Sequence, residues 1–149
     1  MGKVVLFASL VFVACGGKAP AGGTAPAPGA GSTPIYIKKV AVGWSFKKAE
    51  TQTEVYATLT DETGASKSYP AGRYDGECQV TAPRPTAKAL TVATCGSNGT
   101  GVELHAVARA PELILLKFAV APGSAFDPMA GLRIDSIPIP ADAKIEANQ

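Results

Sequence analysis

Four side chains in this sequence carry groups that could do chemistry. They are the thiols of Cys15, Cys78 and Cys95 and the imidazole of His105, the only histidine among the 149 residues. A thiol can attack as a nucleophile, bind a metal or form a disulfide, and an imidazole can act as an acid, a base or a metal ligand. The neighbours of these groups along the chain decide which of these uses each one has.

His105 lies in the alternating segment 102–109, where it shares a face with Glu103, Val107 and Arg109. We expect that face to be solvated. Glu103, two residues away, allows at most a weak metal contact, and the sequence has no G-x-S-x-G nucleophile motif. We therefore expect a structural or solvent-exposed role for His105, with no enzymatic activity, no metal site and no cofactor. A hydrolase that uses His105 stays as an alternative.

Cys15 follows an uncharged run, residues 4–14. As a helix this run would be about 16 Å long, which is too short to cross a hydrocarbon core of about 30 Å. Its length suits the apolar region of a secretory signal, with Lys3 as the positive flank and Ala14 as the small residue before cleavage. The sequence therefore predicts a cleaved signal peptide over residues 1–14.

The residues that end this run, Phe12-Val13-Ala14-Cys15, resemble the lipobox of bacterial lipoprotein signal peptides. In that class the cysteine thiol receives a diacylglycerol, the signal is cut just before the cysteine, and the new amine is acylated. The resemblance, which covers the first fifteen residues, implies that Cys15 carries palmitate-type chains that anchor the protein to a membrane of the cell envelope. Gly16, in place of an Asp, favours the outer membrane, with the rest of the chain in the periplasm or at the cell surface. Two or three acyl chains anchor firmly, since each buried CH₂ contributes about 0.8 kcal/mol.

The other two cysteines form an even pair once Cys15 is acylated, as the resemblance implies. Because the periplasm is oxidising, we expect a disulfide between Cys78 and Cys95. It would close a loop of about eighteen residues and contribute roughly 3 kcal/mol in the chain-entropy model. A redox or metal pair is the alternative, although the spacing is not C-x-x-C.

The chain after Cys15 divides into a linker and a domain. Residues 16–34 hold six Gly, four Pro and five Ala, with no apolar side chain larger than Ala. Such a segment cannot bury enough surface to offset its chain entropy, so residues 15–34 should be a tether. A flexible coil of this length reaches roughly 24 Å. The domain is predicted to cover residues 35–149.

Short β-like runs separated by turn residues fill this domain. The runs predicted as strands are 35–46, 53–60, 78–80, 89–95, 102–109, 113–120 and 131–140, whereas 68–77 reads as turn-rich. Asn98-Gly99 predicts a tight hairpin, because both residues tolerate positive φ. No window combines a 3.6-residue repeat with helix caps. We expect an all-β domain, an antiparallel β-sandwich of about six to eight short strands, with a small closed barrel as the alternative.

Two finer predictions concern faces and edges of this domain. Ile114, Leu116, Phe118 and Val120 share one face of their segment and Lys117 marks the other. The prolines of the last predicted strand confine it to a sheet edge.

The function expected from these features is binding rather than catalysis. A formal net charge of +2 is too small to indicate nucleic acid as a partner. Four aromatic residues could form a recognition surface for peptide or sugar, or could be core and turn residues: Trp44, Tyr56, Tyr69 and Tyr74. We expect a membrane-anchored, non-catalytic β-domain that binds an unidentified protein, glycan or lipid partner. A lipid-anchored inhibitor or assembly factor is the alternative.

Overall fold

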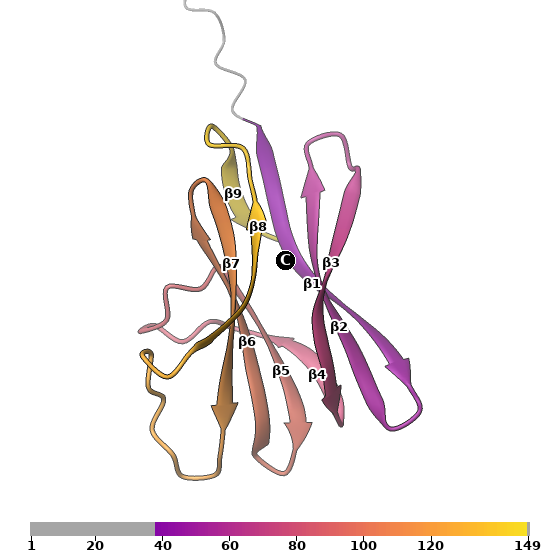
Figure 1. Ribbon diagram of the computed structural model, residues 1–149, viewed down its shortest axis with the longest axis vertical. Helices are drawn as coiled ribbons and strands as arrows, with labels where there is room; N and C mark the ends of the chain where they lie inside the picture. Colours follow the sequence, from indigo (N-terminus) through magenta and orange to yellow (C-terminus); the bar gives the residue numbers. More distant parts are fainter. Residues whose placement is uncertain (1–37, 149) are drawn as a thin grey trace, which may run out of the picture. The chain divides into compact units, whose positions relative to one another are not determined.

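The computed structural model describes residues 38–148, which form an all-β domain of nine strands (Figure 1). The strands are β1 (Lys39–Ala49), β2 (Gln52–Asp61), β3 (Ser66–Asp75), β4 (Glu77–Thr81), β5 (Thr91–Ser97), β6 (Thr100–Arg109), β7 (Glu112–Val120), β8 (Leu132–Pro138) and β9 (Lys144–Ala147). They make a four-stranded sheet in the order β3-β2-β1-β9 and a five-stranded sheet in the order β4-β5-β6-β7-β8. The signal peptide, Cys15 and the linker predicted from the sequence lie outside the described residues.

The two sheets pack face to face as a β-sandwich and do not close into a barrel. Side chains alternate between the two faces of a strand, so each sheet contributes one apolar face to the core. The fully buried core residues come from both sheets: Val42, Val55, Ala57, Ala71, Ala93, Cys95, Leu104, Ala106, Leu113, Leu115 and Ile137. The predicted fold class is confirmed, with one strand more than the range expected.

The predicted Asn98-Gly99 turn is present with the expected backbone. Asn98 and Gly99 join β5 to β6 with φ angles of 54° and 76°, the left-handed conformation that a two-residue hairpin loop of this kind needs. Gly64 turns the chain between β2 and β3 with φ of 86°. The β6–β7 pair is also an antiparallel hairpin.

The segment 68–77 is mostly strand β3, so the prediction of a turn-rich stretch was wrong. Its Gly and Pro residues are accommodated because β3 is the edge of its sheet and its register shifts opposite the Val55–Tyr56 step. Tyr56 pairs with Pro70 and Val55 pairs with Gly72, which leaves Ala71 as the extra residue of a bulge.

The C-terminal strands divide between the two sheets. β8 is an edge strand that ends at Pro138, as predicted from its prolines. The chain then crosses to the other sheet, where β9 pairs with β1 in parallel. Neither β9 nor this parallel pair was predicted from the sequence.

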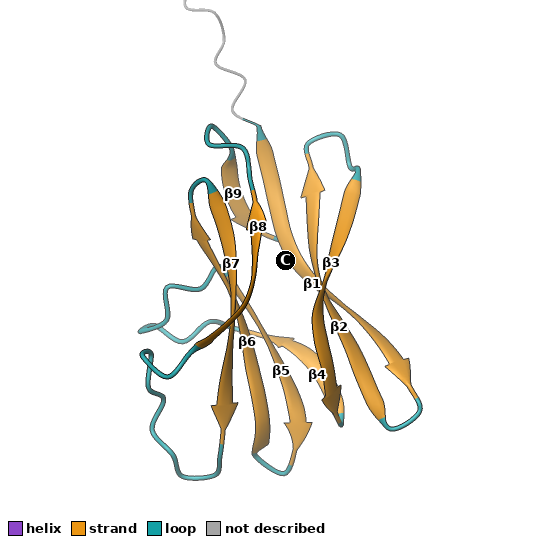
Figure 2. Cartoon of the chain, in the orientation of Figure 1, coloured by secondary structure: helices purple, strands orange, loops and turns teal. Residues whose placement is uncertain are grey.

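Strand β7 is apolar on both faces. Leu113 and Leu115 point into the core, whereas Ile114, Leu116 and Phe118 share the opposite face, in register with Val107, His105 and Glu103 of β6. We call this the outer face of the five-stranded sheet, because it is turned away from the other sheet. Two long connections, residues 82–90 between β4 and β5 and residues 121–131 between β7 and β8, lie on that side of the sheet (teal at the left of Figure 2). Within residues 38–148, no helix is long and apolar enough to cross a membrane.

Candidate functional site

Glu103 and His105 project from β6 onto the outer face, as the alternation predicted, but they are not solvated. The side chain of His105 is 2% exposed and that of Glu103 is 9% exposed. The expectation of a solvated face was wrong for these two residues because the two long connections cover them. Of the remaining residues on this face of β6, Val107 is half-buried and Arg109 is exposed.

Arg84 links the first connection, residues 82–90, to the sheet through hydrogen bonds to Glu103 of β6. Its Nη2 donates to Glu103 Oε1 at 2.6 Å, and its Nε lies 3.3 Å from the same oxygen. These hydrogen bonds, with the positive charge behind them, hold the pKa of Glu103 below its ordinary value, and the same contact raises the pKa of Arg84. Glu103 is therefore a carboxylate at neutral pH with its charge balanced by Arg84.

Phe126 packs the second connection, residues 121–131, against the outer face at His105. Its ring stacks on His105 with centroids 5.5 Å apart and planes inclined by 12°, and it lies 5.0 Å from the ring of Phe118. The guanidinium of Arg84 lies over the Phe126 ring, 5.2 Å from its centroid, a cation–π contact. Gly131 lets the connection approach closely, because a Cβ there would lie 2.5 Å from the Phe118 ring.

His105 retains one ring nitrogen with no partner within residues 38–148. Its Nε2 lies 3.0 Å from Glu103 Oε2, which fixes that nitrogen as the donor to the carboxylate. The structure gives Nδ1 no hydrogen bond in the same range of the chain. The buried side-chain atoms that lack a partner in this range are Trp44 Nε1 and Ser136 Oγ, so Nδ1 of His105 does not by itself indicate a ligand.

A hollow of about 550 Å³ opens between the two connections, with His105 in its lining. We call it the outer groove. Its lining residues are Thr86, Ala87, Lys88, His105, Val107, Arg109, Ile114, Leu116, Phe118, Phe126, Pro128, Met129 and Arg133. Most of these side chains are apolar, with a few polar ones and three cations, which is the usual make-up of a small-molecule site of roughly 300–1,000 Å³.

The arrangement holds two parts of a hydrolytic triad, an imidazole and the carboxylate that orients it. A triad also needs a hydroxyl or thiol nucleophile hydrogen-bonded to the second ring nitrogen. Thr86 is the one hydroxyl in the groove lining, and it makes no hydrogen bond to His105 in the structure. Among the described residues, no group of three or more His, Cys, Asp or Glu is placed to hold a metal ion.

The four aromatic residues proposed as a recognition surface do not lie together. Trp44, Tyr69 and Tyr74 pack against the core from the inner face of their sheet. The Tyr74 hydroxyl donates to the Ala71 carbonyl at 2.7 Å, and burial raises its pKa. Tyr56 points to the opposite face, where its hydroxyl donates to Glu54 at 2.9 Å.

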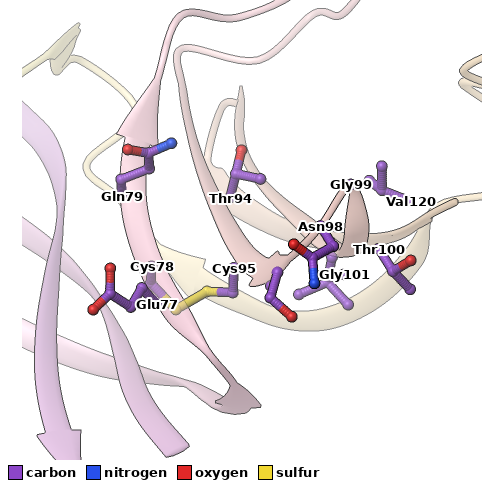
Figure 3. A pocket seen from close by; sticks show the side chains of 13 residues that line it. Glu77, Cys78, Gln79, Thr94, Cys95, Asn98, Gly99, Thr100, Gly101 and Val120 are labelled. Atoms are coloured by element: carbon purple, nitrogen blue, oxygen red, sulfur yellow. A yellow bond between two sulfur atoms is a disulfide. The ribbon is translucent and has the colours of Figure 1, made fainter. Parts of the chain in front are cut away.

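Cys78 and Cys95 form the predicted disulfide. They are paired directly across β4 and β5, with Cα atoms 4.1 Å apart. A second hollow of about 350 Å³ lies beside the bridge, between β4 and the Asn98-Gly99 hairpin (Figure 3). Turn residues and polar strand residues form most of its lining, so it offers a ligand less apolar surface than the outer groove.

Comparisons with protein-family models, with curated proteins and with solved structures found no match to this chain. The function is therefore argued from the site itself.

Sequence reasoning missed Arg84 and Phe126, which complete the site from the two connections. It also missed that Leu116 and Ile114 form a groove floor. One signal was present: the run 113–116 is apolar at four successive positions, which indicates a strand covered on both faces.

Proposed function

We propose that this chain is a lipid-anchored, non-catalytic binding module of the bacterial cell envelope, and that its ligand site is the outer groove. The observation that carries the proposal is the groove itself, an apolar hollow of about 550 Å³ on a face that a β-sandwich normally leaves to water. The anchor rests on the resemblance of residues 12–15 to a lipobox and on the linker composition that follows it.

The chemistry of the lining favours binding over catalysis. The charge of Glu103 is matched by Arg84, and its position behind His105 keeps it out of the groove lining. The floor is formed by aliphatic and aromatic side chains, which stabilise an apolar ligand by removing its surface from water. His105, which is part of the groove lining, adds one polar group that would orient the ligand.

Probe binding tests the groove. A protease site inserted within residues 16–34 allows the full chain to be exported and oxidised before the domain is released. We expect the released domain to bind the neutral fluorophore N-phenyl-1-naphthylamine saturably, with one probe per domain.

The variants are chosen to separate the groove from the rest of the surface. Leu116→Gln changes the floor and Met129→Gln changes an exposed rim residue, 88% exposed, that has no core contacts to lose. The matched control is Val80→Gln on β4, an exposed apolar residue outside the groove. We expect both groove variants to weaken probe binding several-fold and the control to stay within twofold of wild type. Equal binding by all four proteins, or no saturable binding, would exclude the groove as the site.

The anchor is tested on the full chain. Cells grown with a fatty-acid analogue should label the wild-type protein and not the Cys15→Ser variant, and the wild type should partition into the membrane fraction. Labelling that persists in Cys15→Ser would refute the anchor and leave the groove proposal in place.

A further inference from the structure

The outer groove has a strong charge asymmetry. Its lining includes Lys88, Arg109 and Arg133 and contains no Asp or Glu. Three acidic residues lie around it. Glu103 pairs with Arg84, and Glu112, opposite Arg109 in the β6–β7 pair, lies 3.2 Å from Arg133. Asp127 stands between the lining residues Phe126 and Pro128, and its Oδ1 accepts a hydrogen bond from the Met129 backbone N–H. An apolar hollow edged with cations is complementary to a molecule that is apolar along its length and negative at one end.

Two of these cations have no acidic partner in the described part of the chain. Lys88 and Arg109 are both exposed, and neither forms an ion pair within residues 38–148. An exposed cation forms stronger hydrogen bonds with an anion than with a neutral group, and Arg offers a planar fork that suits a carboxylate or phosphate. The Lys88 and Arg109 side chains are therefore the ones available to a ligand head group.

The size of the groove limits the apolar part of the ligand. A volume of about 550 Å³ lies within the range of small-molecule sites, roughly 300–1,000 Å³. That space fits one alkyl chain with its head group. The second chain of a diacyl lipid, or the bulk of a protein partner, would have to lie outside it.

We infer that the outer groove binds a single-chain anionic amphiphile, a free fatty-acid-like molecule. Its chain lies on the floor formed by Leu116, Ile114 and Phe118, and its anionic end lies at Lys88 and Arg109. This inference rests on the proposed function, because it names the ligand class of the same groove.

Displacement of the neutral probe tests the ligand class. Three competitors of equal chain length, dodecanoate, dodecanol and dodecyltrimethylammonium, are compared below their micelle concentrations. We expect dodecanoate to displace the probe at a concentration about tenfold lower than dodecanol, equivalent to about 1.4 kcal/mol, and the ammonium compound to be the weakest. Added salt should reduce the preference, because exposed charges are screened.

Charge variants identify the residues responsible. In Lys88→Gln with Arg109→Gln, we expect the preference for dodecanoate over dodecanol to fall to within threefold. The control is Lys38→Gln with Lys39→Gln, which removes the same charge from exposed positions outside the groove and should keep the preference.

The remaining outcomes distinguish an error in the ligand class from an error in the binding site. Equal displacement by the acid, the alcohol and the ammonium compound would overturn the ligand class and leave the groove as a binding site. Displacement by phosphatidylglycerol vesicles but not by dodecanoate would also overturn it, in favour of a membrane surface. Failure of the probe itself to bind would remove both.

Discussion

Glu103→Gln should destabilise the domain by about 1–2 kcal/mol at neutral pH, and the reason lies in the hydrogen bonds of Glu103. The carboxylate accepts from Arg84 at 2.6 Å and contacts His105 Nε2 at 3.0 Å, with its side chain only 9% exposed. A hydrogen bond to a charged group contributes about 1.5–3 kcal/mol, whereas a neutral one contributes about 0.5–1.5 kcal/mol. Glutamine has nearly the same shape as glutamate but no charge. Both contacts of residue 103 would therefore become hydrogen bonds to a neutral group. Because the Arg84 side chain is 48% exposed, water replaces part of the hydrogen bonding that Arg84 loses. The expected loss of unfolding free energy is therefore about 1–2 kcal/mol, less than the two weakened hydrogen bonds would give if both were fully buried.

The contact between Arg84 and Glu103 also predicts how the difference in unfolding free energy between wild type and Glu103→Gln varies with pH. The pKa of Glu103 is lowered in the folded state, chiefly by the Arg84 hydrogen bond. A lowered folded pKa contributes stability that is present above the unfolded value of about 4.3 and is lost as the pH falls through the folded pKa. Glutamine does not titrate, so the gap in unfolding free energy between wild type and Glu103→Gln should narrow from pH 7 to pH 3. Arg84 and His105, the charged and titratable groups that contact Glu103, are present in both proteins.

Urea unfolding monitored by the fluorescence of Trp44, the single tryptophan, measures both effects. The control is Glu112→Gln on β7, which removes an ion pair whose side chains are both about half exposed, and should change the unfolding free energy by no more than about 0.5 kcal/mol. A Glu103→Gln protein within about 0.3 kcal/mol of wild type at pH 7 would contradict the assignment of these hydrogen bonds as stabilising. A gap of equal size at pH 7 and pH 3 would contradict the assigned protonation state.

Three further predictions use the same urea titration. Cys78→Ser with Cys95→Ser should lose roughly 3 kcal/mol, because the cysteines are 17 positions apart and the bridge restricts the unfolded chain; an unchanged midpoint would contradict this. Leu115→Ala, at 0% exposure, should cost about 2–5 kcal/mol, whereas Leu132→Ala, 64% exposed, should cost less than about 0.5 kcal/mol; similar losses would mean that the core is wrongly placed. Gly101→Ala should cost about 2 kcal/mol or more, because its Cβ would lie 2.0 Å from the Cys95 carbonyl oxygen. Gly64→Ala, in open space at φ of 86°, should cost only about 1 kcal/mol, and the reverse order would refute this reasoning.

The inner faces of the sandwich were predictable because strand alternation has a period of two. The phase that holds Val42 and Trp44 in β1, and Val55 and Ala57 in β2, packs against the core as that period requires. The Asn98-Gly99 hairpin was predictable for a local reason, since few residue pairs tolerate two successive positive φ angles. Both signals depend only on residues close together in sequence.

The missed features depend on contacts between distant segments. β3 contains Pro70 and Gly72, which argue against a strand locally, but an edge position and a bulge accommodate them. Arg84 stands in a Pro-rich connection, and nothing near it indicates that its partner is a carboxylate nineteen residues later. The burial of His105 depends in the same way on Phe126, which follows it by 21 positions.

The groove and the ion pair follow from one structural requirement. A sandwich whose β7 is apolar on both faces exposes Ile114, Leu116 and Phe118 unless another segment covers them. The two connections provide that cover, and Arg84–Glu103 and Phe126–His105 hold them in place. They cover only part of the face, and the uncovered remainder is the outer groove. Because its walls are already held by contacts that do not involve a ligand, a molecule entering the groove orders few side chains, and less of its binding energy is lost to ordering the site.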